Sequence, residues 1–119
     1  MLAKPEVSTP PALDLALLRQ SANAACKLMK TLSNPDRLLL LCQLSQGEKN
    51  VGELEALVGI SQPTLSQQLG VLRDEGLVST RRDGKSIYYC INSPQAVAVM
   101  AALYVQFCQP EPLTQGITA

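Results

Sequence analysis

The sequence predicts a mainly α-helical domain with one two-stranded β-hairpin, arranged as a winged helix-turn-helix. Two observations lead to this fold class. Residues 61–73 combine polar side chains with leucines at helical spacing, which is typical of an amphipathic surface helix. Asp83 and Gly84 follow between the strand-like runs 77–82 and 86–91, and an Asp-Gly pair in that setting indicates a short hairpin. We therefore expect five helices, with the hairpin between the fourth and the fifth.

Composition limits the class of protein. The chain has 119 residues, of which 46% are hydrophobic and 17% are charged, and this favours one compact domain over a disordered chain. Ten basic and ten acidic residues give a net charge of zero, which is weak support for nucleic-acid binding because such domains usually have a basic excess. The local charge at a contact surface matters more than the total. The chain shows no secretory signal and no apolar run long enough to span a bilayer, so we expect a cytoplasmic protein.

The folded domain is expected to cover residues 13–109. Residues 1–12 contain three prolines and little periodicity, which predicts a flexible arm, and residues 110–119 are expected to form a tail. Leucine, alanine and methionine recur at helical spacing over residues 13–29. This spacing predicts a long first helix that ends before Ser33.

The second helix is predicted from a cap and an apolar run. Asn34 can cap this helix, and Pro35 can occupy its first position without losing a hydrogen bond. Residues 38–42 are apolar on every side. We therefore expect a buried core helix that ends near Gly47.

The third and fourth helices form the expected helix-turn-helix. Residues 51–58 have the spacing of a short support helix, and Gly59 can adopt the left-handed conformation that a sharp turn requires. Ser61 is expected to supply the N-cap oxygen of the fourth helix, the recognition helix. One face of this helix is expected to be buried through three leucines, Leu65, Leu69 and Leu72.

The hairpin and the last helix complete the domain. Strand alternation places three apolar side chains on one face of the second hairpin strand, namely Ile87, Tyr89 and Ile91. Ser93 and Pro94 can begin the last helix. Its apolar stripe is formed by Val97, Ala101, Tyr104 and Cys108.

Polar and basic side chains on the recognition helix and the hairpin are the candidate DNA contacts. Glutamine can hydrogen-bond adenine at two positions, and serine and threonine can bond either bases or phosphates. The candidates on the helix are Ser61, Gln62, Thr64, Ser66, Gln67 and Arg73, and those on the hairpin are Arg81, Arg82 and Lys85. A solvated polar helix face without a function is the alternative. The combination of glycine turn, polar helix and basic hairpin, in this order, favours DNA binding.

Three segments resemble the ArsR/SmtB family of repressors: GISQPTLS at 59–66, LRDEGLV at 72–78 and RRDGK at 81–85. The resemblance extends over roughly residues 13–108. It implies a homodimeric repressor with five helices and a two-stranded wing, in which the first and last helices form the dimer interface. It also implies a palindromic operator, because two recognition helices related by a two-fold axis meet successive faces of the major groove. The wing contacts would come from Arg81, Arg82 and Lys85.

The common metal sites of this family are absent from the sequence. One site uses a Cys-Val-Cys segment at the start of the support helix, where this chain has Asn50, Val51 and Gly52. Another uses histidines and carboxylates on the last helix, and this chain has no histidine. Because both donor sets are missing, we expect no metal at either position and no other cofactor.

Four cysteines remain as candidate sensors. For each cysteine alone, the more common role is that of a small buried hydrophobic residue. The BigR/SqrR-like branch of the family, which responds to persulfides, uses one cysteine on the second helix and one near the end of the last helix. Cys42 and Cys108 match those places. The resemblance implies that reactive sulfur or an oxidant joins these two residues, directly or through added sulfur, and so releases DNA. Cys26 and Cys90 are expected to be packing residues.

Three alternatives remain open at the level of the sequence. Arsenite or another thiophilic ion could bind Cys42 and Cys108 together with a third donor. A thiol enzyme is disfavoured because no histidine is present to act as its base, so we expect no catalytic residue. A dimerisation module without DNA binding is supported only by the neutral net charge.

Overall fold

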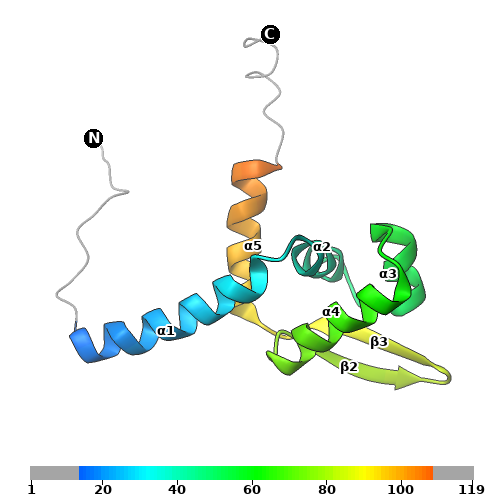
Figure 1. The fold of residues 1–119 in the computed structure, drawn as a ribbon, viewed down its shortest axis with the longest axis horizontal. Helices are drawn as coiled ribbons and strands as arrows, with labels where there is room; N and C mark the ends of the chain where they lie inside the picture. Colours follow the sequence, from blue (N-terminus) through cyan, green and yellow to red (C-terminus); the bar gives the residue numbers. More distant parts are fainter. Residues whose placement is uncertain (1–13, 109–119) are drawn as a thin grey trace, which may run out of the picture. The chain divides into compact units, whose positions relative to one another are not determined.

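The computed structural model describes residues 14–108, which fall into two compact units (Figure 1). The first unit extends to Lys30 and the second begins at Thr31. Helix α1 (Leu15–Leu32) accounts for the described part of the first unit apart from Asp14, whose carboxylate accepts a hydrogen bond from the Ala16 backbone N–H at 2.8 Å. The predicted first helix is confirmed. The predicted arm and tail lie outside the described residues.

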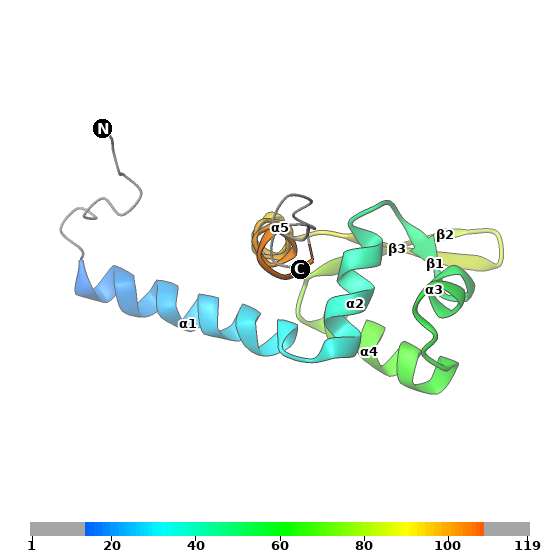
Figure 2. The same cartoon turned by 90° about the horizontal axis from the view of Figure 1, so that it is seen from above.

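The second unit has the predicted winged helix-turn-helix order (Figures 1 and 2). Its elements are α2 (Pro35–Leu44), β1 (Lys49–Asn50), α3 (Val51–Val58), α4 (Gln62–Asp74), β2 (Val78–Asp83), β3 (Ser86–Ile91) and α5 (Pro94–Phe107). The predicted fold class, mainly helical with a β wing, is therefore confirmed. Within residues 14–108, no helix has both the length and the apolar character that a membrane crossing requires.

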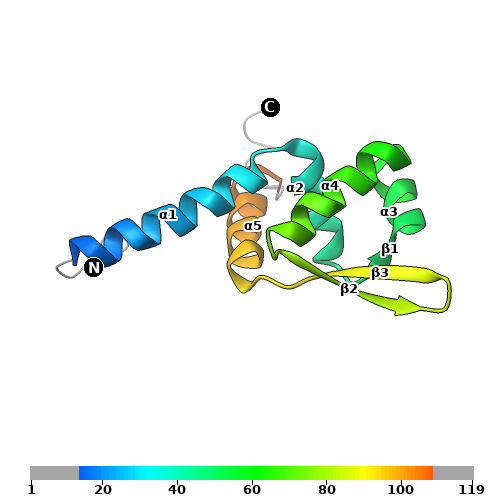
Figure 3. The same cartoon turned by 60° about the horizontal axis from the view of Figure 1, so that its bottom comes forward.

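The sheet contains one strand that the sequence did not predict. β1 pairs antiparallel with β3, and the strand order is β1-β3-β2 (Figure 3). Two residues are too few to show a period, and Lys49 and Asn50 are of types that strands disfavour. Because β3 is the central strand, the wing is joined by backbone hydrogen bonds to the segment that begins α3.

The hairpin is confirmed, with its first strand displaced by one residue from the prediction. Asp83 is the last residue of β2 and pairs with Ser86, so the turn consists of Gly84 and Lys85. Gly84 has a φ of 66°, a backbone conformation that residues other than glycine rarely adopt. The sheet is more exposed near this turn than at its other end, because Ile87 is 38% exposed whereas Val78 is 3% exposed.

Leucines from three helices form the core of the second unit. Leucines of α2, α3 and α4 are completely buried: Leu40, Leu41, Leu54, Leu65, Leu69 and Leu72. The predicted leucine face of the recognition helix is therefore confirmed. The prediction that α2 is buried on every side is wrong, because Leu39 is 49% exposed and Cys42 is exposed. A run of apolar residues does not by itself show which face of a helix packs inward.

Helix caps follow the sequence at two positions and depart from it at two others. Asn34 accepts a hydrogen bond from the Arg37 backbone N–H at 3.1 Å, and the Ser93 hydroxyl accepts one from the Ala96 backbone N–H at 3.1 Å. Ser61 occupies the N-cap position of α4, but the prediction that its hydroxyl caps the helix is wrong. An N-cap side chain normally bonds the backbone N–H of the second or third helix residue. The second residue of α4 is Pro63, which has no backbone N–H.

The cap that the sequence analysis missed begins α3. The Asn50 side chain accepts from the Glu53 backbone N–H at 2.8 Å, and the Glu53 carboxylate accepts from the Asn50 backbone N–H at 2.9 Å. This reciprocal pair is a capping box, and the spacing of Asn50 and Glu53 was the available signal. α3 ends at Gly59, whose φ of 72° confirms the predicted left-handed turn.

Candidate nucleic-acid interface and cysteine pair

The outer face of α4 presents most of the predicted helix contacts to solvent. While the leucines of this helix pack inward, five of the six candidates are exposed, and Thr64 is half-buried. The exposed candidates are Ser61, Gln62, Ser66, Gln67 and Arg73. One helix therefore has a packing face and a polar face, as recognition in a DNA groove requires.

A half-buried polar contact, which the sequence did not predict, fixes the inner side of α4. The Arg37 guanidinium donates to the Gln68 side-chain oxygen at 3.0 Å and to the Thr31 backbone carbonyl at 2.7 Å. Arg37 lies on α2, so its side chain joins α2 to α4 and to Thr31 at the end of α1. Gln68 is thereby held inward, whereas its neighbour Gln67 faces solvent.

Gln62 has a partner inside the protein. Its side-chain amide donates to the Glu55 carboxylate on α3 at 3.2 Å. This contact ties the start of the recognition helix to the support helix. The Gln62 carbonyl oxygen and its second amide hydrogen stay available, so a two-point contact with adenine remains chemically accessible.

The three predicted wing cations have different surroundings. Arg82 and Lys85 are exposed. Arg81 instead forms an ion pair with Glu48 and lies over the Tyr88 ring, with the guanidinium carbon 4.9 Å from the ring centroid. The hydrogen bond from Arg81 holds the pKa of the Glu48 carboxyl below its usual value. Among the three predicted wing cations, Arg81 thus already has an acidic partner within the described part of the protein.

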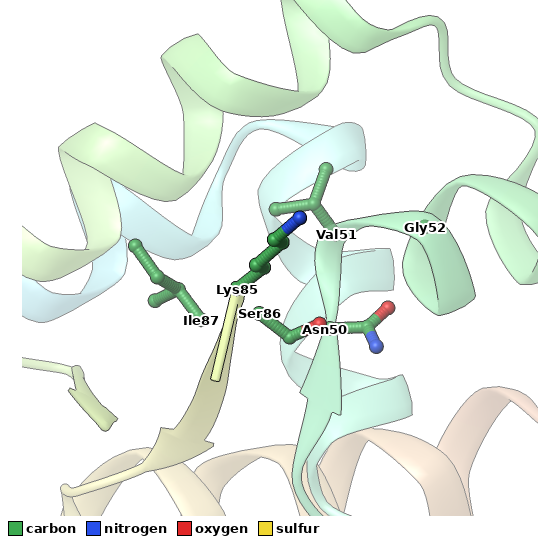
Figure 4. A pocket seen from close by; sticks show the side chains of 6 residues that line it. All are labelled: Asn50, Val51, Gly52, Lys85, Ser86 and Ile87. Atoms are coloured by element: carbon green, nitrogen blue, oxygen red, sulfur yellow. The ribbon is translucent and has the colours of Figure 1, made fainter. Parts of the chain in front are cut away.

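A pocket of about 420 Å³ lies between the start of α3 and the tip of the wing (Figure 4). Its lining residues are Asn50, Val51, Gly52, Lys85, Ser86 and Ile87. They include Asn50, Val51 and Gly52, the positions that correspond to the Cys-Val-Cys site expected from the resemblance to ArsR/SmtB repressors. The pocket offers an ammonium and no thiolate or carboxylate, a donor set unsuited to a metal cation. Among the residues that the structure describes, no cluster of three or more His, Cys, Asp or Glu is placed to hold a metal ion.

Cys42 borders a second pocket, between α2 and α5. This groove has a volume of about 520 Å³ and is lined by Cys42 and by apolar and neutral polar side chains, namely Gln43, Ser45, Gln46, Val97, Met100, Ala101, Tyr104 and Val105. Partial burial of the thiol against this groove raises the pKa of Cys42, although the residue as a whole is exposed, and the charge of Cys108 raises it further.

The two remaining cysteines have different environments. Cys90 is half-buried on β3, and its sulfur lies 3.2 Å from the hydroxyl oxygen of Ser79, its cross-strand neighbour. Cys90 therefore packs inside the sheet, as predicted. Cys26, which was also expected to pack, is exposed on α1. All four cysteines are free thiols in this structure.

Comparisons with known proteins agree with this geometry. Residues 34–80 match the family described as "Bacterial regulatory protein, arsR family". The biofilm growth-associated repressor of Agrobacterium fabrum is 50% identical over 99 residues, which cover 83% of this chain and 85% of that protein. The chain belongs to the ArsR family. The predicted resemblance is therefore confirmed, and the chain is a member of a family of regulators, not of enzymes.

Solved structures of ArsR-family proteins have the same fold. The crystal structure of the transcriptional repressor BigR from Xylella fastidiosa has a TM-score of 0.76 and 49% identity, and it covers 82% of this chain and 100% of that one. The homodimeric winged helix-turn-helix domain of Mb0332 from Mycobacterium bovis has a TM-score of 0.62 and 35% identity, covering 76% of this chain and 81% of that one. The resemblance extends across both the helices and the wing.

Proposed function

We propose that the protein is a homodimeric transcriptional repressor in the cytoplasm that leaves its operator when Cys42 and Cys108 become joined. The repressor assignment is supported by 50% identity to a protein named as a repressor and by the BigR fold. The observation that supports the thiol switch is the position of Cys42 in the groove between α2 and α5, and Cys108, directly after α5, is one cause of the raised pKa of Cys42. Reactive sulfur species or other thiol oxidants are the inducers that this pair suits.

The proposed DNA contacts follow from the two faces of α4. With its leucines buried, the helix can enter a major groove with Ser66 and Gln67 toward the base edges. Arg82 and Lys85, exposed on the wing, then meet the flanking phosphates. In a two-fold dimer both sets repeat, so the operator is palindromic.

Exposed apolar side chains support dimerisation. On α1, Leu15, Leu17 and Met29 are each more than half exposed. On α5, Tyr104 and Phe107 are 55% and 81% exposed. By the period of the helix, Leu15 and Met29 share one face of α1, and Tyr104 and Phe107 share one face of α5. Exposed apolar faces of this kind are usually covered by a partner. A homodimeric relative of the same fold, Mb0332, is consistent with a second copy of this chain as the partner of both helices.

The thiol chemistry balances without a further reagent when the inducer is a persulfide, R–S–SH. A Cys42 thiolate attacks the outer sulfur, which gives Cys42–S–SH and releases the thiolate R–S⁻. The Cys108 thiolate then attacks the sulfur attached to Cys42, which forms the disulfide and releases HS⁻. If Cys42–S–S⁻ first takes the outer sulfur of a second R–S–SH and releases R–S⁻, attack of Cys108 on the middle sulfur gives a trisulfide bridge and HS⁻. A bridge requires the two α-carbons to lie within about 7 Å, so it constrains α2 relative to α5.

Release needs only a modest change in binding equilibrium. A bridged state that disfavours the DNA-bound arrangement by about 1 to 3 kcal/mol weakens the complex about 5- to 150-fold. The shift is a change of population between two arrangements of the dimer, one of which binds the operator.

The test is operator binding by fluorescence anisotropy, with DNA from the protein's own promoter. Reduced protein should bind, and persulfide treatment should weaken binding about 5- to 150-fold together with a mass change on Cys42 and Cys108. Cys42→Ser and Cys108→Ser should keep binding but lose the response, whereas the matched control Cys90→Ser should respond normally. A Cys42→Ser/Cys108→Ser variant that still responds would refute the thiol switch. Reduced protein that retains metal stoichiometrically would instead favour a thiophilic-ion sensor.

A further inference from the structure

An ion pair joins the wing to the segment that precedes α3. Glu48 directly precedes β1, and Arg81 lies 33 residues later, within β2. The sheet order β1-β3-β2 brings these two strands to opposite sides of β3 (Figure 3). The Arg81 Nε donates to both Glu48 carboxylate oxygens at 3.0 Å, and Arg81 Nη2 also donates to Oε1.

Other groups of the wing hold the guanidinium in this place. Tyr88 is the cross-strand partner of Arg81, and its ring lies beneath the guanidinium. The remaining terminal nitrogen, Nη1, lies 3.7 Å from the Asp83 carboxylate. An aromatic ring and two carboxylates therefore fix the direction of Arg81, although its side chain is 52% exposed.

The donors that Glu48 occupies are those that arginine uses to bind phosphate. Carboxylate and phosphate present similarly spaced oxygens, and both accept paired hydrogen bonds from the planar guanidinium. Arg81 cannot direct Nε and Nη2 at Glu48 and at a DNA phosphate together. Within residues 14–108, Arg82 and Lys85 form no ion pair. Of the three wing cations, Arg81 is therefore the one whose donors are already bonded to a carboxylate there.

We propose that Glu48 is an intramolecular competitor of DNA, which occupies the phosphate-binding donors of Arg81 in the free protein and lowers operator affinity. This inference rests on the proposed DNA binding and adds to it a residue that sets its strength. When the wing reaches the DNA backbone, a phosphate oxygen displaces the Glu48 carboxylate from Arg81. Glu48 is then left as an unpaired anion close to the DNA.

The test is the DNA affinity of Glu48→Gln in the full chain, measured by fluorescence anisotropy under reducing conditions. Glutamine keeps the size of the side chain but removes the anion. Because exposed ion pairs are weak, we expect the affinity to rise about two- to fivefold. The dependence on salt should steepen, by up to about one unit of slope per protomer, because no unpaired anion remains to recruit a cation.

Two further variants separate competition from a general effect of charge. Asp74→Asn removes an exposed carboxylate at the end of α4 that is not a partner of Arg81, so its effect measures the loss of charge alone. In an Arg81→Ala background, Glu48→Gln should bring no more gain than Asp74→Asn does. Thermal unfolding of each variant checks that the fold is intact, and Glu48→Ala provides a second test of the same position.

The outcomes are distinct. A gain for Glu48→Gln that exceeds the Asp74→Asn effect, and that falls to the size of that effect in the Arg81→Ala background, supports competition. An unchanged or lower affinity for Glu48→Gln overturns it, because Glu48 would then position Arg81 for DNA. A gain no larger than that of Asp74→Asn, or one that stays larger than it in the Arg81→Ala background, also overturns it. Wild-type protein that binds no DNA removes the proposed function and this inference together, whereas the other failures leave DNA binding in place.

Discussion

At the residue scale, the chemistry of Cys42 depends on its neighbour. The nucleophile in thiol exchange is the thiolate, and a raised pKa reduces the thiolate fraction at neutral pH. Burial is the larger cause of the raised pKa of Cys42, and the charge of Cys108 is the smaller. At neutral pH the thiolate fraction of Cys42 is therefore below that of an ordinary cysteine.

Cys108→Ser should lower the pKa of Cys42, because serine removes the neighbouring negative charge and leaves burial in place. Below the pKa, the alkylation rate of Cys42 should rise about tenfold for each pH unit as thiolate forms, and in the variant this rise should level off at lower pH. The measurement is the iodoacetamide rate at Cys42 against pH, followed by peptide mass. Cys90→Ser serves as the control and should keep the wild-type profile. Identical profiles for Cys108→Ser and wild type would show that the two thiols do not interact.

Among the residues that form polar contacts, Arg37 should contribute most to the free energy of unfolding. Arg37→Ala removes the hydrogen bonds that Arg37 donates to the Gln68 side-chain oxygen and to the Thr31 carbonyl, and such losses cost about 1 to 3 kcal/mol. The free energy of unfolding from urea titration measures this change. Arg82→Ala, in the exposed wing, is the matched control and should unfold like the wild type. Equal stability of both variants would mean that the Arg37 contacts contribute nothing.

At the element scale, the two faces of α4 should respond to different measurements. Leu69 is completely buried, so Leu69→Ala should lower the free energy of unfolding by about 2 to 5 kcal/mol. Gln67 is exposed, so Gln67→Ala should leave stability unchanged and cost about 1 to 3 kcal/mol in operator binding if it contacts a base. Urea titration and anisotropy on operator and random DNA separate the two effects. An equal loss on random DNA would assign Gln67 to the DNA backbone.

The sequence predicts an element when its signal is local, and it does not predict contacts that depend on the whole fold. Periodic leucines are a local signal, so Leu65, Leu69 and Leu72 identified the buried face of α4. β1 has no such signal, because its pairing with Tyr88 and Tyr89 arises from the fold. The Glu48–Arg81 pair, separated by 33 residues, depends on that strand and was equally inaccessible. Arg81 was consequently grouped with Arg82 and Lys85, although its surroundings differ from theirs.

At the scale of the whole molecule, the proposed thiol pair and the proposed DNA interface lie on different elements of one unit. Cys42 is on α2, whose Arg37 holds the inner side of α4 through Gln68. A bridge that displaces α2 would therefore act on the recognition helix through a direct hydrogen bond. The sequence placed Cys42 and Cys108 on helices but gave no measure of their separation, because that depends on how α2 packs against α5.

Dimerisation and operator binding should be lost together. Phe107, on α5, is 81% exposed and apolar, so Phe107→Glu should place a charge in the proposed interface and yield a monomer in sedimentation velocity. Because a monomer contacts one half-site, its operator affinity should fall by at least about a hundredfold, since the second recognition helix no longer binds as part of the same molecule. Gln106→Glu adds the same charge at the neighbouring exposed polar position and should leave a dimer that binds DNA. A Phe107→Glu variant that stays dimeric would place the interface away from the end of α5, and a monomer with full affinity would mean that the two recognition helices do not bind one operator together.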